Sequence, residues 1–223
     1  MAGLGKKTWS AGDTLTAADV NGYLMEQSVM VFAGTAARAS AIPTPSAGMV
    51  AYSTATGLQL YNGSEWNSVT RVGQVVSTVL TSTYTDSSGS GTLTTITGLS
   101  ASITPTFTTS KILVLASVTV GGADASRFVF GLTGGNSATA YIGDAAGTRK
   151  RVATGQVPAD ANGFMNVSLM FLDSPATTNS TTYSVQCAAL AGETVYINRA
   201  ATDTDGTNRG RGASTITVME VLA

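Results

Sequence analysis

The chain has 223 residues, a formal net charge of −1 and only 11% charged residues. A nucleic-acid-binding domain carries a basic face and a high pI, so this balance argues against nucleic acid as a partner. The chain contains no histidine, which excludes Ser-His-Asp and Cys-His catalytic arrangements and imidazole-based zinc sites, and its single cysteine, Cys187, excludes an intrachain disulfide.

The N-terminal region predicts one amphipathic helix. Thr16 offers an N-cap hydroxyl, and Asp19 places a carboxylate in the first turn, where the helix dipole favours it. A stripe at three- and four-residue spacing predicts that the helix runs from about Thr16 to Phe32; it consists of Val20, Tyr23, Leu24, Gln27, Met30 and Val31. Such a helix is marginal alone in water, so the stripe needs a partner, and a second copy of the chain is one candidate.

The next region predicts a short helix followed by a hairpin. The helix spans about Ala36 to Ile42 and ends before a proline pair. Residues 49–52 and 58–61 read as the two strands, residues 53–57 read as their turn, and Asn62-Gly63 is a second turn signal. An isolated hairpin is barely stable, so this one must dock on something larger or pack about an oligomer axis.

From about residue 71 to the end, the pattern is strand and turn without a convincing helix. Several runs alternate apolar and polar side chains; their apolar members are Ile112, Val114, Ala116, Val118 and Val120, then Met165, Val167, Leu169 and Phe171, then Tyr183, Val185 and Cys187, and finally Ile216 and Val218. Short, evenly spaced strands with polar turns indicate an antiparallel sandwich or jelly roll. The predicted fold is therefore mainly β, with a helix in residues 1–34, a short helix and β-hairpin in 35–70, and a jelly-roll-like antiparallel β-sandwich in 71–223.

No catalytic or metal-binding constellation stands out. The best carboxylate cluster is Asp203-Thr204-Asp205-Gly206, but the flanking positions that an EF-hand needs are Ala201 and Gly212, which favours a polar turn. The remaining acidic residues are scattered mainly among loop segments without the pairing that glycosidases need. We therefore expect no enzymatic activity, no cofactor and no metal. The longest apolar run is far shorter than the roughly 20 residues that cross a bilayer, so no membrane insertion is expected.

Two basic clusters carry two interpretations each. One consists of Arg149, Lys150 and Arg151, and the other of Arg199, Arg209 and Arg211. Each could bind an acidic sugar or a phosphate on a cell surface. Each could instead pair with nearby acids such as Asp144, Asp203 and Asp205, and the near balance of charge favours pairing.

Three segments resemble phage proteins. Residues 9–33, from Trp9-Ser-Ala-Gly-Asp to Val-Phe-Ala33, resemble the N-terminal segment of many phage tail and virion-associated proteins, and the hairpin of residues 48–66 is similar to the β-unit that often follows it. Residues 195–221 are similar to C-terminal domains of tail-fibre-like proteins, including those of cyanophages. The resemblance covers about half of the chain, at its two ends, and leaves residues 71–183 without a match.

The resemblance implies a virion protein, placed on the tail more readily than on the head, with an anchored N-terminus and an outward C-terminal sandwich. Such proteins are usually homotrimers. We expect a short trimeric tail fibre or fibre tip, bound to tail or baseplate proteins, with host-surface glycan as a candidate ligand. The expected attachment and trimer residues are Trp9, Val20, Tyr23, Leu24, Gln27 and Val31; the candidate surface-binding residues are Arg149, Lys150, Arg151, Arg209 and Arg211. A capsid decoration or head-fibre protein and a stand-alone carbohydrate-binding module remain the alternatives.

Overall fold

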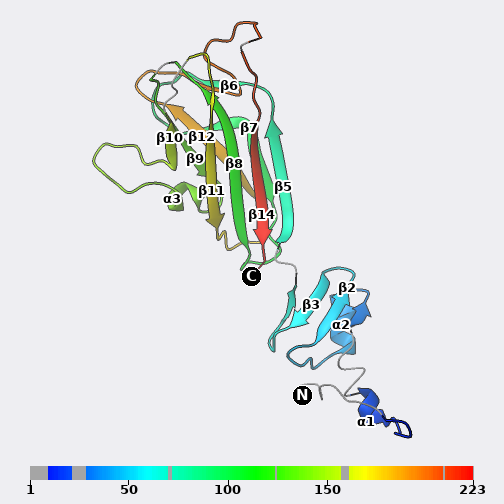
Figure 1. Cartoon of the computed structure of the whole chain (residues 1–223). Coiled ribbons are helices and arrows are strands. Elements are labelled where there is room, and N and C mark those ends of the chain that lie inside the picture. The colour runs from blue at the N-terminus through cyan, green and yellow to red at the C-terminus, as the bar shows by residue number, and fades with distance from the viewer. Residues whose placement is uncertain are drawn as a thin grey trace. The chain divides into compact units, whose positions relative to one another are not determined.

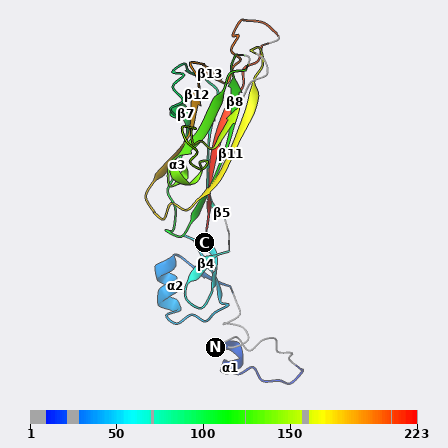
Figure 2. The same cartoon turned by 90° about the vertical axis from the view of Figure 1, so that its left-hand side faces the viewer.

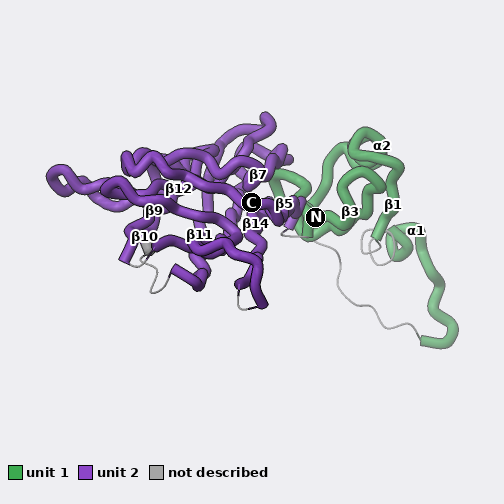
Figure 3. The backbone as a smooth tube through the Cα atoms, turned by 90° about the horizontal axis from the view of Figure 1, so that it is seen from above, with its two compact units in different colours: residues 1–71 green, residues 72–223 purple. Residues whose placement is uncertain are grey.

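A computed structural model of the chain describes residues 10–21, 29–69, 72–123, 125–156, 161–207 and 209–222. The chain forms two compact units, residues 1–71 and 72–223 (Figure 3). Strands dominate both units, so the mainly β prediction is confirmed. Within the described residues, no helix is long and apolar enough to cross a membrane.

The N-terminal unit is a small four-stranded sheet with a helix. Its elements are α1 (Ala17–Asp19), β1 (Met30–Phe32), α2 (Thr35–Ala41), β2 (Val50–Ser53), β3 (Gly57–Tyr61) and β4 (Trp66–Ser68). The strands lie in the order β1-β2-β3-β4, with β1 parallel to β2 and the other pairs antiparallel. The predicted short helix and hairpin are therefore confirmed, and Trp66 begins one more strand.

The predicted N-terminal helix is wrong at its C-terminal end, where Met30–Phe32 form a strand, and residues 22–28 lie outside the described part of the chain. The predicted cap is present, because the Asp19 N–H donates to Thr16 Oγ1 over 3.2 Å and the Thr16 N–H donates to Asp19 Oδ2 over 3.1 Å. They cap the first turn of this segment, α1, and Met30–Phe32 form strand β1, in which Val31 lies opposite Tyr52. Val31 is β-branched and Phe32 is aromatic, and both residue types favour strands. Pairing with β2 gives their backbone N–H and C=O groups hydrogen-bond partners.

The second unit is a sandwich of two sheets. Its elements are β5 (Val72–Leu80), β6 (Tyr84–Asp86), β7 (Thr94–Ile103), β8 (Lys111–Gly121), β9 (Phe128–Thr133), α3 (Ser137–Ala140), β10 (Thr154–Gln156), β11 (Met165–Asp173), β12 (Thr181–Ala189), β13 (Val195–Ile197) and β14 (Ser214–Val221). One sheet runs β10-β9-β12-β7. The larger runs β5-β14-β8-β13-β6, with β11 on the other side of β8 (Figure 1).

Eight of these strands pair as nested antiparallel couples. The couples are β5 with β14, β7 with β12, β8 with β11, and β9 with β10. In chain order, the first of these eight strands pairs with the last, the second with the second-last, and so on inward. The chain therefore resembles one long hairpin whose strand pairs fall alternately in the larger and the smaller sheet. This nesting is the strand arrangement of a jelly roll, so the predicted jelly-roll-like topology is found in the structure.

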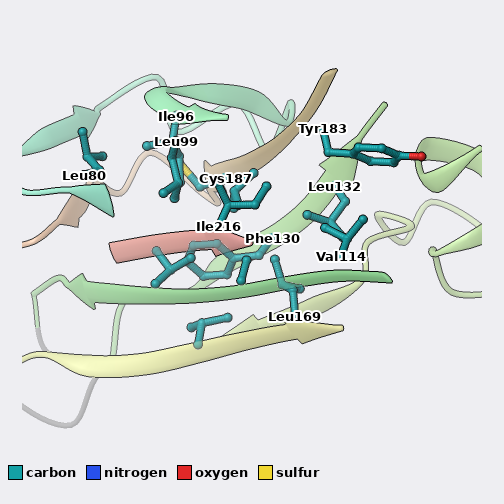
Figure 4. Close-up of a cluster of buried hydrophobic side chains, with 14 of the residues drawn as sticks. Leu80, Ile96, Leu99, Val114, Phe130, Leu132, Leu169, Tyr183, Cys187 and Ile216 are labelled. Atoms are coloured by element: carbon teal, nitrogen blue, oxygen red, sulfur yellow. The ribbon is translucent and has the colours of Figure 1, made fainter. Parts of the chain in front are cut away.

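The core lies between the two sheets. Figure 4 shows Val114 and Leu169 of the larger sheet beside Phe130 and Leu132 of the smaller one, and all four side chains are almost fully buried. The thiol of Cys187 lies in the same cluster, as expected for a small buried side chain, and burial raises its pKa to about 12. The alternating runs predicted from the sequence supply this core, because one side of each strand faces the opposite sheet.

Candidate functional site

The loop that joins β13 to β14, residues 198–213, holds an open pocket of about 330 Å³. Its lining is polar and charged: Asp203, Thr204, Asp205, Gly206, Arg209, Gly210 and Arg211. The pocket therefore brings together the acidic cluster and two of the basic residues that the sequence analysis singled out.

Asn198 fixes the base of this loop at one end of the sandwich. Its Nδ2 donates to the carbonyls of Leu80 (2.7 Å) and Ser82 (2.9 Å), and its Oδ1 accepts from Ser214 Oγ over 2.6 Å. Asn198 is fully buried and has φ +64°, a left-handed conformation that asparagine tolerates better than most residues. The loop is thus anchored to the end of β5 and the start of β14.

The pocket lies far from the point where the chain enters the jelly roll. The chain enters at Val72 and leaves β5 at Leu80, which is bonded to the loop base. At about 3.3 Å per residue, β5 separates these two points by roughly 26 Å. Figures 1 and 2 accordingly show the 198–213 loop at the end of the sandwich away from the end of β14. Loops at the free end of a rigid sandwich are common binding sites.

Asp203 is paired with two arginines. Its Oδ2 lies 2.9 Å from Arg211 Nη2 and 3.7 Å from Arg199 Nη1. The Arg199 guanidinium also lies 4.0 Å from the centroid of the Tyr196 ring and donates to the Ala200 carbonyl over 3.1 Å. Arg199 therefore holds the loop together, and the pairing with Asp203 that the sequence favoured is present.

Arg209 and Asp205 differ from that pair. Within the part of the chain that the structure describes, neither takes part in an ion pair, and Arg209 Nε is buried without a hydrogen-bond partner. The Arg209 N–H donates to the Gly206 carbonyl over 3.0 Å, which closes the turn around the pocket. A donor and an acceptor group thus line the pocket with their bonding capacity unused by other described side chains.

An aromatic ring borders the loop. Phe164 is 44% exposed, and a Cβ on Gly210 would stand 2.8 Å from its ring, so the loop backbone approaches the ring closely at this glycine. The pocket lining therefore combines a guanidinium donor, carboxylate acceptors and the Thr204 hydroxyl, and the Phe164 ring lies beside Gly210 at its border. Nothing in the sequence marks Phe164 as part of this site, because it precedes β11 and lies far from the loop in the chain.

The second basic cluster lies elsewhere. Arg149, Lys150 and Arg151 are exposed in the segment between α3 and β10, and none of them lines the pocket. Arg151 Nε donates to the Gly143 carbonyl over 2.8 Å, and no described ion pair joins this cluster to Asp144. The two candidate surface-binding clusters therefore form two separate surfaces.

The N-terminal attachment residues are only partly placed. Val20 is half-buried just after α1, and Val31 lies on β1 with 72% of its surface exposed. Trp9, Tyr23, Leu24 and Gln27 lie outside the described residues. Val31 therefore belongs to a sheet face and not to a helical stripe.

The acidic cluster gathers no third ligand. Over the described ranges, no group of three or more His, Cys, Asp or Glu side chains could hold a metal ion. Three of the other acidic residues lie on strands and are buried: Asp86, Asp173 and Glu220. Each lies at or next to a strand end, where loop N–H groups reach its carboxylate.

Comparison with known proteins gives no family. No family model matches the chain, and a search of curated proteins finds none that is similar to it.

Proposed function

We propose that the chain is a structural virion protein, a short trimeric phage tail fibre or fibre tip, whose N-terminal unit anchors it and whose jelly roll contacts the host surface. The observation that carries the proposal is the polar pocket with an aromatic border at the end of the jelly roll opposite the chain entry. The N-terminal resemblance to phage virion proteins supports the placement, and jelly rolls are frequent in viral coat and lectin domains.

A sugar ring is the ligand that this pocket suits best. The C–H face of a sugar packs on an aromatic ring, as Phe164 offers, while its hydroxyls need both donors and acceptors. Arg209 donates, Asp205 accepts, and Thr204 does both. We therefore propose host cell-surface glycan as the ligand class.

Immunogold electron microscopy tests the placement. Antibody raised against residues 72–223 is applied to the particles that carry this protein. Label at the tail tip or baseplate is the expected result. Label over the head would replace the fibre with a capsid decoration protein, and absence of label on every particle would reject a virion role.

Binding to the polysaccharide purified from the host cell surface tests the ligand. Phe164→Ala and Arg209→Ala should each weaken binding at least about tenfold, or ~1.4 kcal/mol. Arg149→Ala, in the separate basic cluster, should leave binding unchanged. Loss of binding with Arg149→Ala alone would move the site to the segment between α3 and β10. Binding by a protein that runs as a single chain and labels no particle would favour a stand-alone carbohydrate-binding module.

A further inference from the structure

The outer face of the larger jelly-roll sheet has an apolar half. Met219 of β14 lies opposite Val75 of β5 on one side and Leu113 of β8 on the other, and Leu113 lies opposite Leu172 of β11. Leu115 and Met170 form a pair in the next row. These six residues, Val75, Leu113, Leu115, Met170, Leu172 and Met219, are called the apolar face below.

Much of the apolar face is open to solvent in the single chain. Val75 is 57% exposed, Met170 65% and Leu172 47%, while the other three are half-buried. None of the six is charged. In the half of the same sheet nearer the pocket, β14, β8 and β11 are polar, because Ser168 lies opposite Ser117, which lies opposite Thr215, while β5 carries the exposed Val79 in that row. The change in polarity therefore runs along these three strands and not along β5.

The outer face of the smaller sheet is polar where β7 pairs with β12. On its outer face Ser100 and Ser184 are joined by a hydrogen bond of 2.7 Å, and so are Ser102 and Thr182. Thr95 lies opposite Gln186 on the same face. One such hydroxyl pair, Ser77 with Thr217, also lies on the larger sheet, at the edge of the apolar face. An exposed apolar patch rimmed by polar residues marks a contact surface.

The size of the apolar face suits a contact between proteins. Four strands about 4.8 Å apart, over about three residues each, give a flat footprint on the order of 200 Å². That area is about a quarter of a standard interface, which covers about 800 Å² on each partner, and it suits the centre of one, from which charge is excluded.

Charge and the N-terminal unit both indicate a copy of the same chain as the partner. In a cyclic assembly identical residues gather around one axis, and an uncharged face meets its copies without repulsion. The sheet of the N-terminal unit follows the same plan. Its inner side carries buried Arg38, Ser53 and Gln59, whereas its other side exposes Val31 (72%), Tyr52 (42%), Leu58 (38%) and Leu60 (40%).

We infer that the apolar face is the contact between the chains of the trimer, an inference that rests on the trimer of the proposed function. It places association on the jelly roll, in addition to the N-terminal residues expected from the sequence. The host-binding pocket then lies at the opposite end of the same strands, free of the contact.

Light scattering of the full chain and two variants tests the inference. Met170→Asp puts a charge at the most exposed position of the apolar face, and Thr95→Asp puts the same charge on the outer face of the smaller sheet. We expect three times 22.5 kDa for the unaltered chain and for Thr95→Asp, but a single-chain mass for Met170→Asp with its circular dichroism preserved. A Met170→Asp variant that keeps the three-chain mass would reject this interface and leave the trimer standing. A single-chain mass for the unaltered protein would reject both.

Thiol labelling gives a second measurement that does not require the assembly to be broken. Cys187 is fully buried, so a cysteine introduced on the surface is the main target of a maleimide under native conditions. Met170→Cys should resist labelling in the assembled protein, whereas Thr95→Cys should label fully. Equal labelling of the two variants would show that the apolar face is open and would overturn the inference.

Discussion

Glu220 is a buried carboxylate at an inward position of β14, in line with Ile216 and Val218. Gln74 Nε2 donates to it over 2.9 Å and Thr106 Oγ1 over 3.0 Å, and the Thr106 N–H donates as well. Burial acts to raise the pKa of Glu220, but hydrogen bonds from the Thr106 N–H and from the Thr106 and Gln74 side chains lower it below the ordinary value. The ionised carboxylate thus ties the loop after β7 and strand β5 to the last strand.

Glu220→Gln should destabilise the jelly roll at neutral pH by about 2 kcal/mol, because the amide loses charge-assisted bonds and faces the Thr106 N–H with fewer acceptors. The folded pKa lies below the unfolded one, so the contribution of Glu220 is present above about pH 4.3, the ordinary value, and is lost as the pH falls through the folded pKa. Thermal melting between pH 7 and 3 checks both points. The variant should lose less stability on acidification than the unaltered chain, whereas Asp144→Asn, at an exposed position, should follow the unaltered chain. Identical pH dependence of Glu220→Gln would contradict this role.

At the scale of elements, the turn between β9 and α3 joins three strands through Asp173. The carboxylate of Asp173, at the end of β11, accepts from Tyr183 Oη of β12 over 2.6 Å and from the Asn136 N–H of the turn over 3.2 Å. Burial, together with this bond and the charge of Asp173, raises the pKa of Tyr183. Gly135 precedes Asn136 with φ +51°, and a Cβ there would overlap the Asp173 carboxylate. The turn therefore needs glycine for space as well as for conformation.

Gly135→Ala and Gly147→Ala separate these two requirements. Gly147 has φ +60° with nothing within 4 Å of an added Cβ, so its substitution costs about 1–2 kcal/mol for the left-handed backbone alone. Gly135→Ala should cost a further ~1–3 kcal/mol from overpacking. Denaturant unfolding of the two variants measures the difference. Equal shifts of the midpoint would show that Asp173 moves aside without cost.

The strands of the core were predictable, because a two-residue period with one buried side is visible in runs such as Ile112 to Val120. The sequence could not show where the N-terminal helix stops. Met30 and Val31 fit a helical spacing, and only their pairing with β2 makes them a strand. The alternation of apolar and polar residues also does not show which strands pair with each other. The pairing of β5 with β14, the first and last strands of this unit in the sequence, is therefore known only from the structure. Of the candidate site, the charged residues were predictable and Phe164 was not.

At the scale of the whole molecule, the two units have separate sheets, and the jelly roll has its own core. Among the described residues, its buried cluster draws only on positions from Leu80 to Val218, and its two sheets contain no strand of the N-terminal unit. A unit of about 150 residues buries enough surface to fold alone. The jelly roll is therefore expected to fold without the residues that precede it.

Expression of residues 72–223 alone tests this independence, with Cys187 as the reporter. Only the thiolate reacts with thiol reagents, and in the folded jelly roll the thiol is buried with its pKa raised to about 12. The shortened chain should show a β-type circular dichroism spectrum and resist labelling in buffer. It should label completely in denaturant, and the full chain serves as the control in both conditions. Rapid labelling of the shortened chain in buffer would mean that the core opens without the N-terminal unit. That unit would then stabilise the jelly roll directly, which the separate cores do not predict.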